Sequence, residues 1–198
     1  MKKLLVISWL SLLFSAIAAL FWYNELVYHL PTPVPANYKA VNRGRVIDLS
    51  SALTIYNDKP VFIHFFNPSC PCSRFNIANF REIYTQYNHQ LNFIVVVMSS
   101  KKYSVTEIQS RFGIDIPVLF DASIATRCGV YSTPQAVVLD AQHKLYYRGN
   151  YNQSRYCTDE KTNYARLAIE GLLQRNNNLT FSPFALKAYG CSLPNCTK

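Results

Sequence analysis

The chain has 198 residues, of which 49% are hydrophobic, and a formal net charge of +9 at pH 7. Once a membrane segment is set aside, that length suits one domain of ordinary size, and no second domain is needed. The basic residues are dispersed: adjacent pairs occur at Lys2-Lys3 and Lys101-Lys102, and no run of five exists. This pattern argues against nucleic-acid binding and fits a domain that lies near an anionic membrane surface.

Residues 1–25 have the composition of a transmembrane anchor. An uncharged apolar stretch from Leu4 to Tyr23 follows two lysines and is long enough to cross a bilayer. The positive-inside tendency places the N-terminus in the cytoplasm and the rest of the chain outside. Residues 16–18 also have the small-x-small form of a signal-peptide cleavage site, although apolar residues continue beyond it. Both alternatives export the domain, and we expect a single-pass protein of the bacterial inner membrane that faces the periplasm.

Three segments follow the anchor. Residues 26–40 contain Pro31, Pro33 and Pro35 and form a stiff, extended tether. Residues 41–176 are expected to form the folded domain, and residues 177–198 a cysteine-containing tail.

The most informative segment joins a predicted strand to a predicted helix. The apolar run 61–66 predicts a buried strand, and Pro71 suits the first position of a helix, where its missing N–H would be unbonded anyway. Cys70 is thereby placed at the helix N-cap, with Cys72 just inside the helix. A thiolate at Cys70 would lie at the positive end of the helix dipole with Arg74 one turn on, so we expect a lowered pKa and a nucleophilic role. A buried cysteine pair or a structural metal site is the alternative.

The remaining pattern predicts elements in the order β-α-β-α-β-β-α. Apolar residues three and four positions apart predict a helix that extends from Pro71 to residue 87, and the apolar run 91–98 predicts a strand buried on both faces. Further along the chain we expect a helix at 101–111, an extended segment at 116–120, a helical turn at 122–127, strands at 136–139 and 145–148, and a helix at 159–175.

A strand, a cysteine at a helix N-cap, a βαβ unit and Ser132-Thr133-Pro134 before a β-hairpin together resemble the thioredoxin fold. Segment 129–140 is similar to membrane-anchored periplasmic thioredoxin-like and peroxiredoxin-like redoxins, and residues 188–192 are similar to the tails of some of them. The resemblance implies an α/β three-layer sandwich with a central mixed sheet, preceded by one transmembrane helix. It also implies that Pro134 is cis and that the Thr133 backbone offers strand-like hydrogen bonds to a bound peptide.

The chain departs from this family at the second cysteine. The two reactive cysteines of the family are three residues apart, whereas Cys72 is two after Cys70 and Ser73 occupies the third place. Two residues along a helix turn by about 200°, so we expect Cys72 to point away from Cys70. An oxidised Cys70–Cys72 pair would be strained and easily reduced; otherwise Cys72 is a bystander.

The other four cysteines are expected to be structural. Cys128 precedes a glycine at a predicted helix end and is interpreted as a small buried hydrophobe. Cys157, Cys191 and Cys196 are interpreted as clamps for the tail, through a bridge from Cys157 to Cys191 or Cys196. His64 lies within the buried strand and is expected to be a core histidine rather than a ligand.

The sequence therefore predicts a thiol–disulfide oxidoreductase that acts on protein thiols and disulfides without a cofactor. Cys70, Cys72, Thr133 and Pro134 are the expected site residues. A copper-binding or copper-chaperone protein of the periplasm is the alternative, because Cys70 and Cys72 supply two soft ligands that suit Cu(I). A non-catalytic binding module on the same fold is the third possibility.

Overall fold

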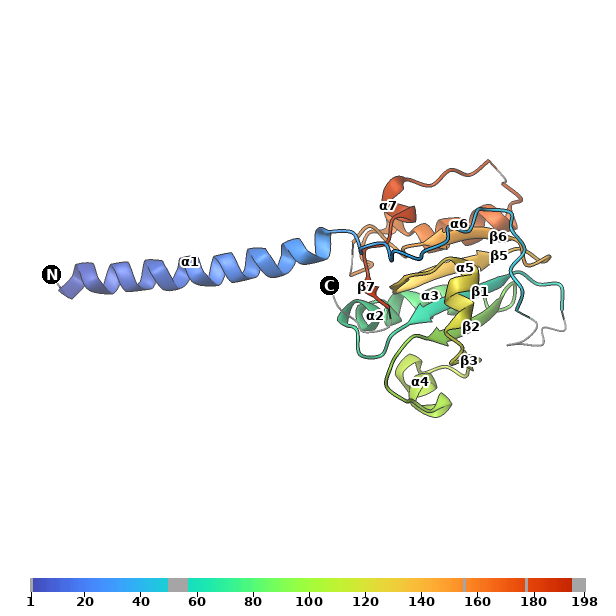
Figure 1. The fold of residues 1–198 in the computed structure, drawn as a ribbon, viewed down its shortest axis with the longest axis horizontal. Coiled ribbons are helices and arrows are strands. Elements are labelled where there is room, and N and C mark those ends of the chain that lie inside the picture. The colour runs from blue at the N-terminus through green and yellow to red at the C-terminus, as the bar shows by residue number, and fades with distance from the viewer. Residues whose placement is uncertain (1, 50–56, 155, 177, 194–198) are drawn as a thin grey trace.

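The computed structural model describes residues 2–49, 57–154, 156–176 and 178–193. Helix α1 (Lys2–His29) extends away from the folded domain (Figure 1). Its segment Lys2–Leu26 is long and apolar enough to cross a membrane, and none of its most apolar stretch is buried against the domain. The predicted apolar N-terminal helix is therefore present as a candidate membrane span.

Five strands form the central mixed sheet, in the spatial order β3-β2-β1-β5-β6. The middle strand β1 (Val61–Phe66) runs parallel to β2 (Asn92–Val97) and antiparallel to β5 (Gln135–Leu139). Strand β3 (Val118–Leu119) extends the parallel side, and β6 (Leu145–Gly149) extends the antiparallel side. The predicted central strand at 61–66 is confirmed with the same bounds.

The helices differ from the sequence prediction in four places. The helix predicted from Pro71 to residue 87 is divided in two at Asn76, and the helix predicted from residue 101 begins after Ser104, whose side chain forms a capping box with Glu107. The helix predicted at 159–175 is a short 3₁₀ helix followed by an α-helix from Tyr164, and the short helix at Pro183–Leu186 was not predicted. The helices are α2 (Pro71–Phe75), α3 (Ile77–Tyr87), α4 (Val105–Phe112), α5 (Ser123–Cys128), the 3₁₀ helix η1 (Glu160–Thr162), α6 (Tyr164–Leu173) and α7 (Pro183–Leu186).

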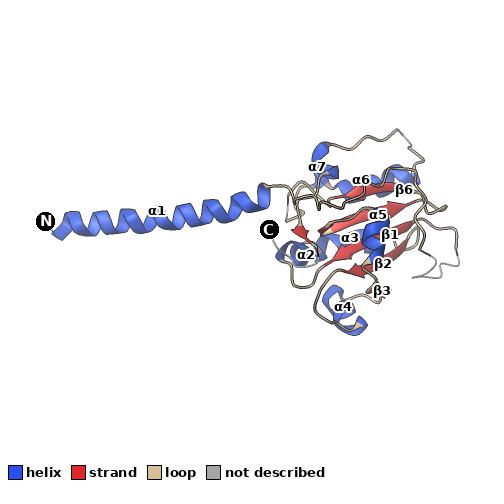
Figure 2. Ribbon diagram, in the orientation of Figure 1, coloured by secondary structure: helices blue, strands red, loops and turns tan. Residues whose placement is uncertain are grey.

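Apolar layers cover both faces of the sheet, as Figure 2 shows for the helices on either side of the strands. Phe62 and Phe66 of β1 pack with buried residues of α3, α4 and α6, whereas Ile63 and Phe65 pack with Ile124 of α5 on the opposite face. This alternation follows from the period of two in a strand. The result is the predicted three-layer, thioredoxin-like α/β sandwich with a central mixed sheet.

His64 belongs to the first of these layers. Its Nδ1 lies 2.7 Å from the hydroxyl of Tyr151, and its ring stacks on Phe80 at 4.6 Å. Burial lowers its pKa to about 3, so the imidazole is neutral at physiological pH. The expectation of a core histidine is confirmed.

The end of the chain returns to the domain as a strand that the sequence pattern did not reveal. Strand β7 (Cys191–Ser192) pairs antiparallel with β4 (Ser132–Thr133) in a separate two-stranded sheet. In Figure 1 this pair lies beside α2, at the end of the domain from which α1 departs. The tail is therefore part of the folded domain, next to the start of α2.

Candidate functional site

A compact turn presents Cys70 at the start of α2. The side-chain oxygen of Asn67 accepts a hydrogen bond from the Ser69 N–H (3.0 Å), and its carbonyl accepts one from the Cys70 N–H (3.0 Å). Cys70 is the N-cap, with extended backbone angles (φ −90°, ψ 124°), and Pro71 is the first helical residue. Ser73, three residues after Cys70, uses its hydroxyl oxygen to accept from the Asn67 N–H (3.3 Å). The predicted N-cap position of Cys70 is confirmed.

Cys70 forms a disulfide with Cys191 across 121 residues of sequence, with 6.8 Å between the two Cα atoms. The predicted bridge between Cys157 and Cys191 is therefore wrong, and Cys157 is a free thiol. The reason is the path of the tail: β7 runs along β4 and places Cys191 opposite Thr133, next to Cys70. Cys196 lies outside the described residues.

Cys72 supplies a third sulfur to the same site. The Sγ atoms of Cys70, Cys72 and Cys191 all lie within 4.8 Å of one another, and all three residues are buried. The expectation that Cys72 points away from Cys70 is wrong. Its premise was a helical rotation from one cysteine to the other, but Cys70 is still extended, so helical rotation begins only at Pro71.

Strand pairing fixes the tail beside Pro134. Thr133 is opposite Cys191 and Ser132 is opposite Ser192. The hydroxyl of Ser132 donates to the Cys191 carbonyl at 3.1 Å. The Thr133–Pro134 peptide bond is cis, as the resemblance to the thioredoxin fold implied. The backbone of Thr133 is thus already engaged by a strand of the same chain.

Thr32, which follows α1, holds the tail from the other side. The backbone N–H of Thr32 donates to the Ala188 carbonyl at 2.8 Å, and its hydroxyl donates to the Gly190 carbonyl at 2.7 Å. The same hydroxyl lies 3.0 Å from the hydroxyl of Ser132, and Thr32 is only 3% exposed. Thr32, Cys70 and Ser132, from three distant parts of the sequence, therefore hold the tail in place.

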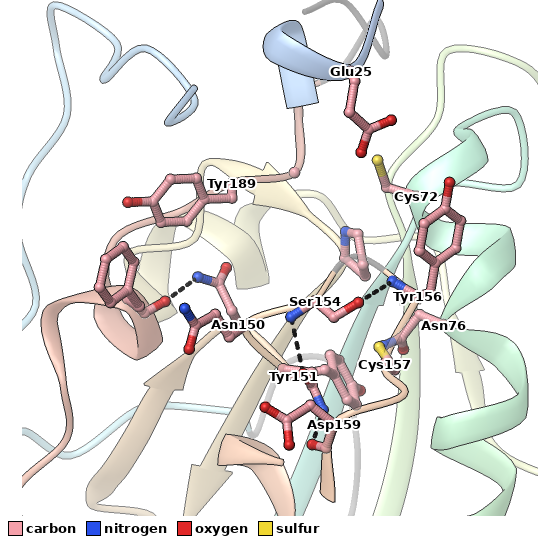
Figure 3. Close-up of a pocket in the computed structure, with 15 residues that line it drawn as sticks. Glu25, Cys72, Asn76, Asn150, Tyr151, Ser154, Tyr156, Cys157, Asp159 and Tyr189 are labelled. Atoms are coloured by element: carbon pink, nitrogen blue, oxygen red, sulfur yellow. Dashed lines mark hydrogen bonds between the residues drawn. The ribbon is translucent and has the colours of Figure 1, made fainter. Parts of the chain in front are cut away.

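A cavity of about 440 Å³ lies beside Cys72 (Figure 3). Cys72 lines it, whereas Cys70 and Cys191 do not and are 0% and 2% exposed. Figure 3 shows Glu25 of α1 and Cys72 pointing toward one another at one end, with Cys157 at the other. A molecule that enters this cavity reaches the sulfur of Cys72 before it reaches the disulfide.

The two remaining described cysteines are poor nucleophiles. The side-chain N–H of Asn76 donates to the Cys157 sulfur at 3.1 Å, and burial raises the pKa of that thiol to about 11. Cys128 is fully buried in the second apolar layer, and burial raises its pKa to about 12. The interpretation of Cys128 as a small buried hydrophobe is confirmed.

The structure brings the four predicted site residues, Cys70, Cys72, Thr133 and Pro134, close together. The sequence did not indicate the contacts of Thr32 and Gly190 with this site, and it gave Cys191 another partner. One signal was available. Ser73 stands where a second reactive cysteine is expected, which left Cys72 or a cysteine elsewhere in the chain as the partner of Cys70.

Solved structures share this fold at low sequence identity. A hypothetical protein from Sinorhizobium meliloti 1021 is 17% identical with a TM-score of 0.63, over 80% of this chain and 97% of that one. An uncharacterized conserved protein from Geobacillus kaustophilus is 16% identical with a TM-score of 0.58, over 76% and 93% of the two chains. A thioredoxin-like protein in the oxidized form is 19% identical with a TM-score of 0.47, over 71% and 93%. No curated relative matches the sequence significantly.

One family model matches most of the chain. It covers residues 41–194, which include the turn before α2, the cis-proline loop and the tail strand. It carries the description "Domain of unknown function (DUF6436)". The chain belongs to this family, whose matched region holds all three sulfurs of the site.

Proposed function

We propose that the protein is a membrane-tethered thiol–disulfide oxidoreductase in which Cys70 is the nucleophile. The observation that carries the proposal is the Cys70–Cys191 disulfide, which joins a helix N-cap to a strand paired with Thr133 beside Pro134. Disulfide exchange needs a thiolate that attacks and a thiolate that leaves. The N-terminus of α2 favours the Cys70 anion in both roles.

The exchange proceeds in two steps. A substrate thiolate attacks the Cys70 sulfur, forms a substrate–Cys70 disulfide and releases the Cys191 thiolate. A second substrate thiolate then attacks the first substrate sulfur, which completes the substrate disulfide and releases the Cys70 thiolate. The protein gains the two electrons that the substrate loses. The same steps in reverse reduce a substrate disulfide.

Cys72 is proposed as the thiol that exchanges with this pair. Its sulfur lies within 4.8 Å of both bonded sulfurs and lines the cavity. If the Cys72 thiolate attacks the Cys191 sulfur, a Cys72–Cys191 disulfide forms and the Cys70 thiolate leaves, with no net oxidation. The nucleophile is then released while the tail stays attached.

The proposed location is the bacterial inner membrane, with the domain in the periplasm. Lys2 and Lys3 precede an apolar helix long enough to span a bilayer, which supports a cytoplasmic N-terminus. In Figure 1, α2 and β7 lie at the end of the domain nearest α1, so the site would face the membrane surface. Protein thiols and disulfides are the proposed partners, and no cofactor is needed for the exchange.

The test compares the full chain in detergent with two variants. A peptide with two cysteines is oxidised by the oxidised protein, and its disulfide is reduced by the reduced protein. Cys70→Ser is expected to lower both rates at least about a thousandfold, because the nucleophile is lost. Cys128→Ser, a buried cysteine outside the site, is expected to stay within about twofold. If Cys70→Ser keeps either activity, Cys70 is not the nucleophile.

Copper binding is a second candidate, favoured by the convergence of three sulfurs. After reduction of the Cys70–Cys191 bond, three soft ligands would lie within reach of one Cu(I) ion. The reduced full chain would then retain about one equivalent of copper after desalting, and Cys72→Ser would weaken the retention. Stoichiometric copper without peptide exchange would favour this function over the first.

A further inference from the structure

The tail lies along β4 in the manner of a bound peptide. Cys191 is opposite Thr133, Ser192 is opposite Ser132, and the Cys191 sulfur is bonded to Cys70. Within the described residues, β7 is the single strand partner of β4. Cys191 therefore occupies the position that the cysteine of a substrate would take in a mixed disulfide with Cys70.

The residue before this cysteine has no room for a side chain. A Cβ atom at Gly190 would lie 2.1 Å from the Thr133 carbonyl oxygen and 2.6 Å from the Ser132 hydroxyl. Carbon and oxygen atoms that are not bonded do not approach this closely. The Thr133 carbonyl cannot move away easily, because its backbone leads directly into the main sheet. Any chain that follows the path of the tail must have glycine at this position.

The hydrogen bonds that Thr32 and Ser132 make to the tail use its backbone and not its side chains. Thr32 and Ser132 bind the carbonyl groups of Gly190 and Cys191, and the Thr32 N–H binds the carbonyl of Ala188. Backbone contacts of this kind give affinity for any extended segment, whereas the steric limit at Gly190 gives selectivity.

We propose that the β4 edge is a binding site for extended protein segments in which glycine directly precedes the reactive cysteine. Residues 188–192 occupy this site as an internal copy of such a segment. The inference rests on the proposed function and adds its substrate class. A substrate binds after the Cys70–Cys191 bond is reduced and the tail has left β4.

The test uses two hexapeptides, Ala-Tyr-Gly-Cys-Ser-Leu and Ala-Tyr-Ala-Cys-Ser-Leu, each with thionitrobenzoate bonded to its cysteine. The Cys70 thiolate attacks the peptide sulfur, forms a peptide–Cys70 disulfide and releases the coloured thionitrobenzoate anion. The protein is the reduced full chain in detergent, carrying Cys72→Ser and Cys191→Ser so that the mixed disulfide accumulates, and Gly190→Ala so that the tail does not occupy β4. The same protein with Cys70→Ser measures the background from other thiols.

The glycine peptide is expected to modify Cys70 at least about tenfold faster than the alanine peptide. The two peptides should react equally with glutathione, which has no groove. Equal rates at Cys70 would overturn the inference and leave the oxidoreductase proposal standing. Failure of both peptides to modify Cys70, located by mass spectrometry, would contradict the proposed function itself.

A second variant tests the internal copy directly. Gly190→Ala in the otherwise unchanged chain should prevent the tail from docking, so the equilibrium constant for the Cys70–Cys191 bond in a glutathione buffer should fall at least about tenfold. Ser192→Ala is the matched control, because it lies in the same strand and adds no atoms. An unchanged equilibrium in Gly190→Ala would show that the steric limit does not operate.

Discussion

Cys70 and Cys128 are both fully buried, and both lie at the end of a short helix, but at opposite ends. Cys70 precedes α2, where the helix dipole favours a negative charge. Cys128 is the last residue of α5, before Gly129 in the left-handed region (φ 71°), where the dipole opposes a negative charge. Burial alone therefore does not decide whether a sulfur is reactive. We expect the helix end and the presence of partner sulfurs to decide it.

The largest expected contrast is in alkylation of the reduced full chain. With a pKa of about 12, Cys128 has a thiolate fraction of about 10⁻⁵ at pH 7. The thiolate of Cys70 is favoured by its helix end, so iodoacetamide should modify Cys70 at least about a thousandfold faster, as measured by mass spectrometry of timed samples.

Equal labelling of Cys70 and Cys128 at pH 7 would show that the two helix ends do not differ in thiol reactivity. It would favour the third alternative, a binding module without a reactive sulfur. Cys72→Ser is the control, because it shows that the rapid labelling belongs to Cys70 rather than to its neighbour.

The same two cysteines illustrate what the sequence could predict. The N-cap position of Cys70 follows from an apolar strand and Pro71, which are adjacent in the chain. The helix end at Cys128 follows from Gly129, and its burial is typical of an unpaired cysteine. These features depend on a few neighbouring residues, as does the order of helices and strands along the chain.

The partner of Cys70 could not be predicted in this way. Cys191 is 121 residues away, and its strand has two residues, too few to show a period of two. The direction of Cys72 was also missed, because it depends on where helical geometry begins rather than on spacing. Contacts of Thr32 with the tail connect segments that have no shared pattern in the sequence.

The second prediction concerns the disulfide between Cys70 and Cys191, which the variant Cys191→Ser removes. In the chain-entropy model, a disulfide that closes a loop of this length contributes up to about 5 kcal/mol, and measured values are commonly about 2 to 4 kcal/mol. Cys191→Ser should lower the free energy of unfolding by about that amount in urea titrations without reductant. With reductant present, variant and wild type should agree. A variant as stable as the oxidised wild type would mean that the bond does not form.

The third prediction concerns His64, which resembles Cys128 because burial keeps it uncharged. Its pKa is lowered from 6.5 to about 3, so below pH 6.5 the unfolded chain binds a proton that the folded chain does not. Stability should therefore fall by up to about 1.4 kcal/mol for each pH unit from 6.5 toward 3. Urea titrations between pH 7 and 5 measure this slope before most carboxylates titrate. His64→Phe should flatten it, and an unchanged slope would assign the proton to another group.

The smallest effect is expected at Cys157, which the sequence grouped with Cys191 as a clamp. The structure separates the two, because Cys191 is bonded to Cys70 whereas Cys157 is a free thiol that accepts a hydrogen bond from Asn76 at 3.1 Å. Serine at position 157 keeps an acceptor for Asn76, so Cys157→Ser should change the free energy of unfolding by no more than about 1 kcal/mol. Peptide exchange should stay within about twofold. A loss of stability as large as that of Cys191→Ser, seen only without reductant, would instead show that Cys157 forms a disulfide in the oxidised protein. The cavity that separates Cys157 from Cys72 would then be a path for sulfur exchange rather than a space for a ligand.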